Sequence, residues 1–148
     1  MSDAIKVVDI SDKDVVHRES VAEGVIRLRR STVEALKSRS LGKGDPIATA
    51  QVAATLAVKR TSEIIPACHN VPIEHIGVSF EVGEDRVRVL CNVKSSSKTG
   101  VEMEALFGVV TALLTIWDMV KEVEKDAAGQ YPEVEINSVR VVKKVKAV

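Results

Sequence analysis

The stretch TGVEMEALFGVVTALLTIWDMVKEVEK, residues 99–125, has the helical period that organises the rest of the chain. Its apolar residues recur every three or four positions, as on the buried face of a helix. The predicted core stripe is Leu106, Val109, Val110, Leu113, Trp117 and Val120. The uncharged run 105–117 is shorter than the about 20 apolar residues that cross a bilayer. We therefore expect a long core helix, with Thr99 and Glu102 as a capping box at its start.

The opposite side of this helix is also uncharged. Where a solvated helix would carry lysine and glutamate, it has small residues. They are Gly108, Thr111, Ala112 and Thr115. A chain of 148 residues has little material to cover such a helix on both sides. We expect part of this face to pack against another helix or another subunit.

Outward from this helix, period-two alternation predicts strands over residues 22–28, 76–82, 87–93 and 136–145. A capping box of Ser31 and Glu34 predicts a short helix to about residue 38. Asp45 and Pro46 suit the start of a further helix, which Pro66 ends after residue 65. The order predicts an α+β fold: a ferredoxin-like antiparallel sheet with helices packed on one face and one additional helix. We expect residues 1–18 to form an extended or mobile arm and residues 19–148 a single catalytic domain.

Composition excludes several classes of protein. Lysine and arginine number 21, aspartate and glutamate 21, so the net charge is +0, which argues against a nucleic-acid coat or an anionic-membrane binder. Aromatic residues, at 3%, are too few for a base-stacking surface. Two cysteines and three histidines fit no metal-ligand spacing, so we predict no structural metal. The first residues lack the basic and apolar segments of a signal peptide, and we expect a cytoplasmic protein.

The long helix carries a candidate acid/base group. Asp118 and Lys121 are spaced as a surface ion pair, or alternatively as a carboxylate and an amine that transfer protons at a cleft edge. The charge-free run before Asp118 favours the second interpretation. Glu104 lies nearly in line with Asp118 on the helix and has no evident structural role. Glu102 and Met103 have ordinary roles open to them, in capping and in core packing.

Three further segments could bind anions or reach a cleft. In GKGD, residues 42–45, Lys43 stands between two glycines before a helix start, which suits an anion site or an ordinary flexible turn. His69 and Cys68 lie in a loop, where the histidine can titrate or simply be hydrogen-bonded, and no partner base makes Cys68 a nucleophile. The basic residues near the C-terminus protect an edge strand or contact phosphate. They are Arg140, Lys143, Lys144 and Lys146.

Several of these segments form a specific combination. They are GKGD with the following ATA and AVKRT, IPACHNVP at 65–72, KTGVEMEAL at 98–106 and ALLTIWDMVK at 112–121. They resemble the cyclic pyranopterin monophosphate synthase family, the C protein of molybdenum cofactor biosynthesis. The likeness extends from about residue 8 to residue 144. The chain ends KKVKAV where the family has a glycine-rich basic tail of the form SGGKSG.

The resemblance implies a cytoplasmic lyase. It rearranges 3',8-cyclo-7,8-dihydroguanosine 5'-triphosphate to cyclic pyranopterin monophosphate and releases pyrophosphate. By the resemblance, Lys43, Asp118 and Lys121 fall on catalytic positions, with Asp118 and Lys121 as a coupled acid/base pair. The implied substrate-binding positions are Ala67, Cys68, His69, Glu102, Met103, Glu104 and Lys144. The family implies dimers assembled to a hexamer with sites at subunit contacts; no cofactor is implied, although magnesium could accompany the triphosphate.

Two other functions compete with this enzyme. One is a noncatalytic nucleotide- or RNA-binding ferredoxin-like module, with GKGD and the basic C-terminus as anion contacts; neutral charge and few aromatics weigh against it. The other is an oligomeric scaffold whose polar residues only build interfaces. The enzyme predicts instead that Lys43, His69, Glu104, Asp118 and Lys121 converge in one pocket, within one chain or across an interface.

Overall fold

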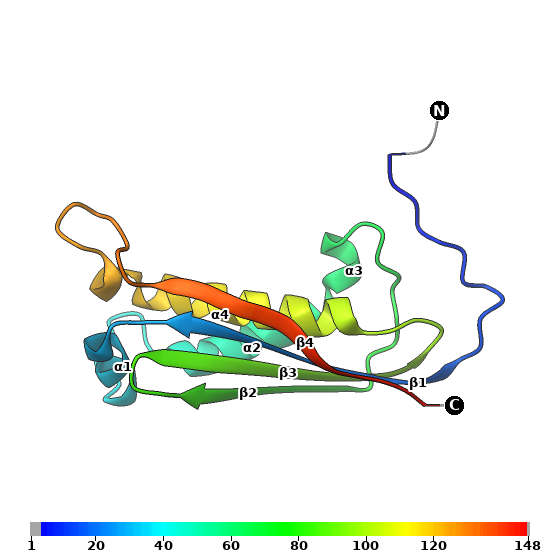
Figure 1. The fold of residues 1–148 in the computed structure, drawn as a ribbon, viewed down its shortest axis with the longest axis horizontal. Coiled ribbons are helices and arrows are strands. Elements are labelled where there is room, and N and C mark those ends of the chain that lie inside the picture. The colour runs from blue at the N-terminus through cyan, green and yellow to red at the C-terminus, as the bar shows by residue number, and fades with distance from the viewer. Residues whose placement is uncertain (1–3, 148) are drawn as a thin grey trace.

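A computed structural model describes residues 4–147, which form one layer of helices on one face of an antiparallel sheet (Figure 1). The sheet order is β2-β3-β1-β4. This order confirms the predicted ferredoxin-like α+β arrangement. Residues 4–147 form four helices where three were expected, because the second expected helix is interrupted. The elements are β1 (Val16–Arg27), α1 (Arg30–Lys37), α2 (Pro46–Lys59), α3 (Thr61–Ile64), β2 (His75–Val82), β3 (Arg86–Ser97), α4 (Glu102–Glu124) and β4 (Glu135–Ala147).

Helix α4 packs closely on the sheet because a glycine of β1, which has no side chain, lies beneath it. A Cβ on Gly24 would lie 2.7 Å from side-chain atoms of both Leu113 and Val109, so only hydrogen fits there. By length and composition α4 could span a membrane, yet 44% of its most apolar window is buried within this fold. The buried residues of α4 are Glu104, Ala105, Gly108, Val109, Ala112, Leu113, Ile116, Val120 and Glu124.

Helices α2 and α4 lie side by side, which confirms that the small-residue face packs against another helix. At Gly108 an added Cβ would lie 2.8 Å from the Cys91 sulfur and 2.9 Å from Val58. Ala54 of α2 places its carbonyl oxygen 3.7 Å from the same point. Thr111 and Thr115 remain half-buried at the edge of this contact. The predicted core stripe is therefore rotated toward α2, and Leu106, Val110 and Trp117 are only partly buried.

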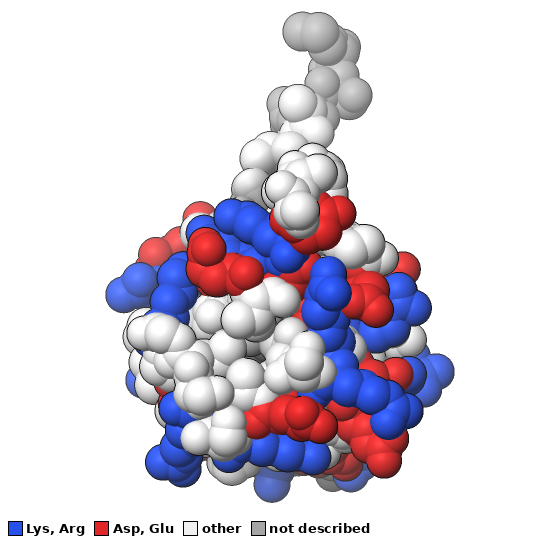
Figure 2. Space-filling view, turned by 90° about the vertical axis from the view of Figure 1, so that its left-hand side faces the viewer, with Lys and Arg blue, Asp and Glu red and all other residues white. Residues whose placement is uncertain are grey.

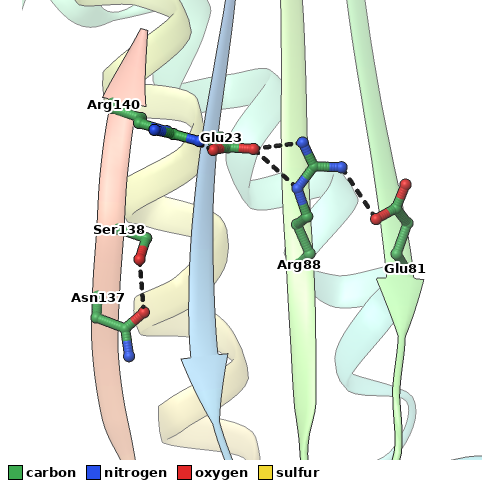
Figure 3. Close-up of polar contacts among 6 residues, drawn as sticks. All are labelled: Glu23, Glu81, Arg88, Asn137, Ser138 and Arg140. Atoms are coloured by element: carbon green, nitrogen blue, oxygen red, sulfur yellow. Dashed lines mark hydrogen bonds and ion pairs between the residues drawn. The ribbon is translucent and has the colours of Figure 1, made fainter. Parts of the chain in front are cut away.

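The face of the sheet opposite the helices carries an ion-pair network across all four strands (Figure 3). Glu23 on β1 is almost fully buried there, because Arg88 and Arg140 cover it from the neighbouring strands. Arg140 Nε donates to Glu23 over 2.6 Å, and Arg88 Nη1 reaches Glu81 on β2 over 3.0 Å. The hydrogen bonds from Arg88 and then Arg140 hold the pKa of Glu23 below its usual value. A bulge in β4 beside Glu23, with Ser138 at φ 56°, accompanies the placement of Arg140.

Helix starts agree with the sequence at one position only. The Asp45 carboxylate accepts from the amides of Ile47 and Ala48, with Pro46 in the first turn, as predicted. The capping boxes predicted at Ser31 and Thr99 are wrong, because α1 begins at Arg30 and α4 at Glu102, both without a side-chain cap from their N-cap residue. At α1 a long-range carboxylate, that of Glu124, takes the place of the local cap.

Two other boundaries differ from expectation. The helix expected over residues 46–65 is interrupted at Arg60, where the Thr61 hydroxyl donates to the carbonyl oxygens of Ala57 and Val58. Strand β1 begins at Val16 and pairs with Ser97, so its first residues fall within the range expected as an arm. Both differences come from tertiary pairing and local side-chain bonding that hydrophobic periodicity does not record.

Glu124, at the end of α4, is the partner that starts α1. Its side chain is fully buried and accepts from the Thr32 hydroxyl and, over 2.9 Å, from the Arg29 amide. The Arg29 guanidinium also donates to the Glu124 carbonyl oxygen over 3.2 Å. A carboxylate is favoured at a helix N-terminus, where backbone amides are unpaired. This contact fixes α1 against the C-terminal end of α4.

Substituting Gly108 tests the close approach of α2 and α4. We expect Gly108→Ala to lower the free energy of unfolding by about 1–3 kcal/mol, because the methyl group overlaps Cys91 and Val58. Chemical denaturation measures this change. Gly42→Ala is the control, since its methyl group meets open space. An unchanged or higher stability of Gly108→Ala would contradict the packing.

Removing the buried carboxylate of Glu124 should cost more than removing an exposed one. We expect Glu124→Ala to lower the free energy of unfolding by about 2–4 kcal/mol, because it leaves the Thr32 hydroxyl and Arg29 amide unpaired. The matched control is Glu122→Ala, whose carboxylate is exposed and pairs only with Lys125. An equal loss of unfolding free energy in the two variants, measured by urea denaturation, would show that the buried contact stabilises the fold no more than the exposed one.

Candidate active site

Three of the predicted residues meet at the C-terminal half of α4, and we call them the Asp118 cluster: Lys43, Asp118 and Lys121. Lys43 Nζ lies 3.2 Å from Asp118 Oδ2, and Lys121 Nζ lies 3.3 Å from Asp118 Oδ1. Lys43 also donates to the Asp118 main-chain oxygen over 3.2 Å. Each carboxylate oxygen therefore has its own ammonium partner. Spacing predicted the Lys121 pair, the family resemblance placed Lys43 with it, and the fold brings all three into contact.

Local structure explains how Lys43 reaches α4. Asp45 fixes the start of α2, and Gly44 has φ +110°, a conformation that residues with a side chain rarely adopt. The loop turns there and directs Lys43 across to Asp118. Beside it is a small cavity of about 120 Å³, lined by Leu41, Gly42 and Lys43 with residues of α4. Figure 2 views the end of the molecule that carries α1, where charged side chains of both signs surround an uncharged area.

The two ammonium groups keep Asp118 ionised. Its pKa is lowered, first by the hydrogen bond from Lys43 and then by that from Lys121. All three side chains remain open to solvent, so the cluster is available to a ligand. An ionised carboxylate between two ammonium groups can accept a proton, pass one on or bind a phosphate through its lysines.

A second group of residues gathers at the opposite end of α4, and we call it the Glu104 cluster: Cys68, Glu102, Glu104 and Lys144. Glu104 is 3% exposed, and its Oε2 accepts from the Cys68 thiol over 3.7 Å. Its other oxygen, Oε1, is buried without a hydrogen-bond partner among the described residues. Burial raises the pKa of Glu104. A buried carboxyl with a free oxygen can bind a ligand N–H or O–H group.

Cys68 is a poor nucleophile in this setting, as expected from the sequence. Burial, then the neighbouring charge of Glu104 and its hydrogen bond, raise the pKa of the Cys68 thiol to about 11. The thiol is therefore protonated at neutral pH, whereas nucleophilic cysteines react as thiolates. Cys68 acts here as a hydrogen-bond donor to Glu104.

Glu102 is paired with the last strand instead of capping α4. Lys144 Nζ on β4 lies 2.9 Å from Glu102 Oε1. Burial tends to raise the pKa of Glu102, but the hydrogen bond and charge of Lys144 and the charge of Arg18 outweigh it, and the pKa is lowered. Met103 is 43% exposed, so it faces outward, away from the core. Ala67 is also exposed, in the loop beside Cys68.

His69 lies in that same loop and contacts the N-terminal segment. Its Nε2 atom is hydrogen-bonded to the main-chain oxygen of Val8. The ring is half-buried. His69 is thus held by a part of the chain that the sequence did not connect to any site.

The two clusters do not converge within one chain. Glu104 and Asp118 lie about 21 Å apart along α4, because a helix rises about 1.5 Å per residue. A cavity of about 570 Å³, lined by Arg27, Arg29 and Arg30 among others, belongs to neither cluster. One pocket within one chain is therefore excluded for the residues that the structure describes, and the alternative across an interface remains.

Sequence reasoning missed Arg18 and Glu124, although both left a signal. Arg18 is 5% exposed and shares the helix-facing side of β1 with Ala22 and Ile26, where a charged residue is out of pattern. Its Nη2 donates to the Lys98 main-chain oxygen over 3.3 Å. Glu124 likewise continues the buried stripe of α4 one turn after Val120. Within residues 4–147 no group of histidine, cysteine or carboxylate side chains could hold a metal ion.

Comparison with known proteins gives one consistent result. Residues 7–147 match the model of the MoaC family. A Pyrococcus abyssi protein described as a probable cyclic pyranopterin monophosphate synthase is 54% identical over 142 residues, 96% of this chain and 89% of that protein. A Sulfurisphaera tokodaii protein with the same description is 53% identical over 141 residues, 95% and 93% of the two chains. A Methanothermobacter thermautotrophicus protein, described as a probable synthase accessory protein, is 51% identical over 142 residues, 96% and 89%.

The contacts of the Asp118 cluster predict how each lysine affects the pKa of Asp118. We expect Lys43→Met to raise the pKa of Asp118 toward its ordinary value of 3.8, and Lys121→Met to raise it less. In the wild type the ion pairs persist at any pH above the lowered pKa of Asp118, which lies below 3.8. They are lost as the pH falls through that lowered pKa. A carboxyl ¹³C NMR titration of Asp118 in both variants measures the order. A larger effect of Lys121→Met would contradict the leading role of Lys43.

The Glu104 cluster predicts the reactivity of a thiol. We expect Glu104→Gln to lower the pKa of Cys68, because it removes the negative charge beside the sulfur while burial remains. Alkylation by iodoacetamide at about pH 9 should then become faster, since the thiolate reacts. Cys91 is the internal reference, because it is buried away from Glu104 with a pKa raised to about 12. Unchanged Cys68 alkylation would contradict the contact.

Proposed function

The chain belongs to the MoaC family, and we propose that it acts as a cyclic pyranopterin monophosphate synthase. It is a lyase of molybdenum cofactor biosynthesis. Its substrate is 3',8-cyclo-7,8-dihydroguanosine 5'-triphosphate, which it rearranges with release of pyrophosphate. The observation that carries this proposal is the pairing of Asp118 with both Lys43 and Lys121 at an open edge of α4. Neither a noncatalytic binding module nor a scaffold needs such a pair.

The Asp118 cluster supplies the proton transfers of the reaction. Opening and rejoining a purine-derived ring needs groups that accept and donate protons. Asp118 and Lys121 act as a coupled pair in this proposal, because the Lys121 ammonium donates to the Asp118 carboxylate and both lie on one face of α4. Lys43 assists, either by a proton transfer of its own or by neutralising phosphate charge as pyrophosphate departs.

The Glu104 cluster binds the substrate. The free, buried Oε1 of Glu104 offers an acceptor for a ring or amino N–H, and Glu102 holds Lys144 beside it as a phosphate-binding ammonium. Cys68, His69 and Ala67 form one wall, from the loop after α3. Met103 is exposed at the same end of α4 and provides an apolar contact. Magnesium, where present, accompanies the triphosphate as part of the substrate.

A second copy of the chain completes the site in this proposal. Residues 104 and 118 are equally spaced from Thr111 on α4, and both lie on nearly the same side of the helix. If two copies of α4 pack antiparallel about a two-fold axis near Thr111, Glu104 of each copy approaches Asp118 of the other. The separation of about 21 Å within one chain then becomes a contact between chains.

The surface around this axis is apolar, as such a contact requires. On α4, Met103 is 43% and Leu114 56% exposed, and Phe107 and Val110 lie half-buried between them. On α2, Val52 is 62% and Leu56 44% exposed. These side chains cover the outer side of the helix layer, opposite the sheet. The same proposal includes the assembly of three dimers into a hexamer. It also includes a cytoplasmic location, which suits the free thiols Cys68 and Cys91.

Direct turnover tests the function. Purified protein is given the cyclised dihydroguanosine triphosphate, and pyrophosphate and cyclic pyranopterin monophosphate are measured. We expect turnover by the wild type and a loss of about a hundredfold or more in kcat for Asp118→Asn. Glu122→Gln, an exposed carboxyl on the next turn of α4, is the matched control and should keep activity.

Two outcomes would contradict the proposal. A folded wild type without turnover would favour the noncatalytic nucleotide- or RNA-binding module, which a steeply salt-dependent nucleic-acid affinity would then support. Equal turnover by Asp118→Asn and Glu122→Gln would remove Asp118 from the chemistry.

A further inference from the structure

The N-terminal segment, residues 4–15, is the least explained part of the chain. It runs outside the sheet, beside the loop that follows α3, before the chain enters β1 (Figure 1). Its apolar side chains Ile5, Val7 and Val8 are exposed, so burial of side chains does not hold it in place. Main-chain and polar contacts hold it instead.

A tight turn fixes this segment beside the N-terminal end of α4, where the Glu104 cluster lies. The Asp9 carboxylate accepts from the Ser11 amide over 2.9 Å and from the Ser11 hydroxyl. The Lys13 amide donates to the Ile10 carbonyl oxygen over 3.0 Å and closes the turn. Lys98, in the loop before α4, donates to the Ser11 carbonyl oxygen over 2.9 Å. The position of Val8 is therefore set by the turn that follows it.

The contact between Val8 and His69 determines where the imidazole carries its proton. A main-chain carbonyl oxygen can only accept a hydrogen bond, so His69 Nε2 must be the donor. A neutral imidazole has a single N–H, which leaves the lone pair on Nδ1. Among the hydrogen bonds of residues 4–147, none engages Nδ1 of His69, so that lone pair is available.

We propose that the N-terminal segment is a positioning element of the substrate site: the Val8 carbonyl holds His69 in the Nε2–H form and leaves Nδ1 to accept a hydrogen bond from the substrate. This proposal rests on the proposed function, since it takes His69 as a substrate contact. It deepens that function by assigning His69 a chemical class of partner. The partner is an N–H or O–H of the guanine-derived ring or the sugar, not a phosphate oxygen, which offers no hydrogen to a lone pair.

The assignment divides the recognition of the substrate between two kinds of group. Ammonium groups such as Lys144 meet the phosphates, because they donate hydrogen bonds and carry positive charge. The His69 ring, through Nδ1, meets the part of the substrate that carries exchangeable hydrogens. Loosening the N-terminal turn should therefore weaken substrate binding while leaving the Asp118 cluster intact, because none of the described contacts of Lys43, Asp118 and Lys121 involves residues 4–15.

Matched variants of the full-length chain separate these effects. Asp9→Ala removes the carboxylate that accepts from the Ser11 amide and hydroxyl within the turn, whereas Asp12→Ala removes the same charge from an exposed position of the same segment. The first readout needs no substrate: ¹⁵N NMR of protein labelled at its three histidines, recorded in the solid state above the pH at which the rings are protonated. His17 and His75 are internal references.

We expect the wild type and Asp12→Ala to show His69 protonated at Nε2 alone. In Asp9→Ala the His69 signals should move to a mixture of both neutral forms. In turnover, Asp9→Ala should raise KM about five- to tenfold with kcat within about twofold, as for the loss of one hydrogen bond. His69 signals that match in Asp9→Ala and wild type, or that place the proton on Nδ1, would overturn the proposal, as would a changed His69 with an unchanged KM. A wild type without turnover would contradict the proposed function, while the NMR comparison would still decide how the segment holds His69.

Discussion

The close packing of α4 against the sheet and α2 is the constraint on which the rest of the structure depends. Gly24 and Gly108 leave no room for a methyl group where β1, β3 and α2 approach the helix. The helix is therefore held along its length, and its two ends are fixed relative to each other. Lys43 and Lys121 gather around Asp118 at one end, and Cys68 and Glu104 meet at the other. A helix of this length keeps the two clusters apart within one chain, so each cluster forms half of a site in the proposed dimer.

Much of this architecture could be predicted from periodicity, because β1, β3 and α4 each bury one regular face. The small-residue face of α4 also predicted a helix packed against it, which α2 provides. The predicted caps at Ser31 and Thr99 were wrong because distant residues compete with the local pattern. Glu124 supplies a carboxylate at the start of α1, and Glu102 pairs with Lys144 of β4 instead of capping α4. Rules based on neighbouring residues do not say which distant residue will hydrogen-bond to a helix end.

The contacts of the candidate site could likewise be predicted from the sequence only in part. The i,i+3 spacing of Asp118 and Lys121 was readable from the sequence, whereas their partnership with Lys43 spans 75 residues and needed the fold. The contact of Cys68 with Glu104 spans 36 residues and depends on the loop after α3. The distance between the clusters could have been calculated from the helix alone. The link from Val8 to His69 left no signal in the sequence, because a main-chain oxygen makes it.

The central claim is that two copies of α4 form each active site, and mixing two inactive variants tests it most directly. Glu104→Ala and Asp118→Asn subunits are unfolded together, refolded at equal amounts and assayed for turnover. In randomly mixed dimers half of the pairs are mixed and each restores one intact site, so about a quarter of wild-type activity should return. Each variant refolded alone should stay inactive. A mixture no more active than the separate variants would show that the two residues do not act across a subunit contact.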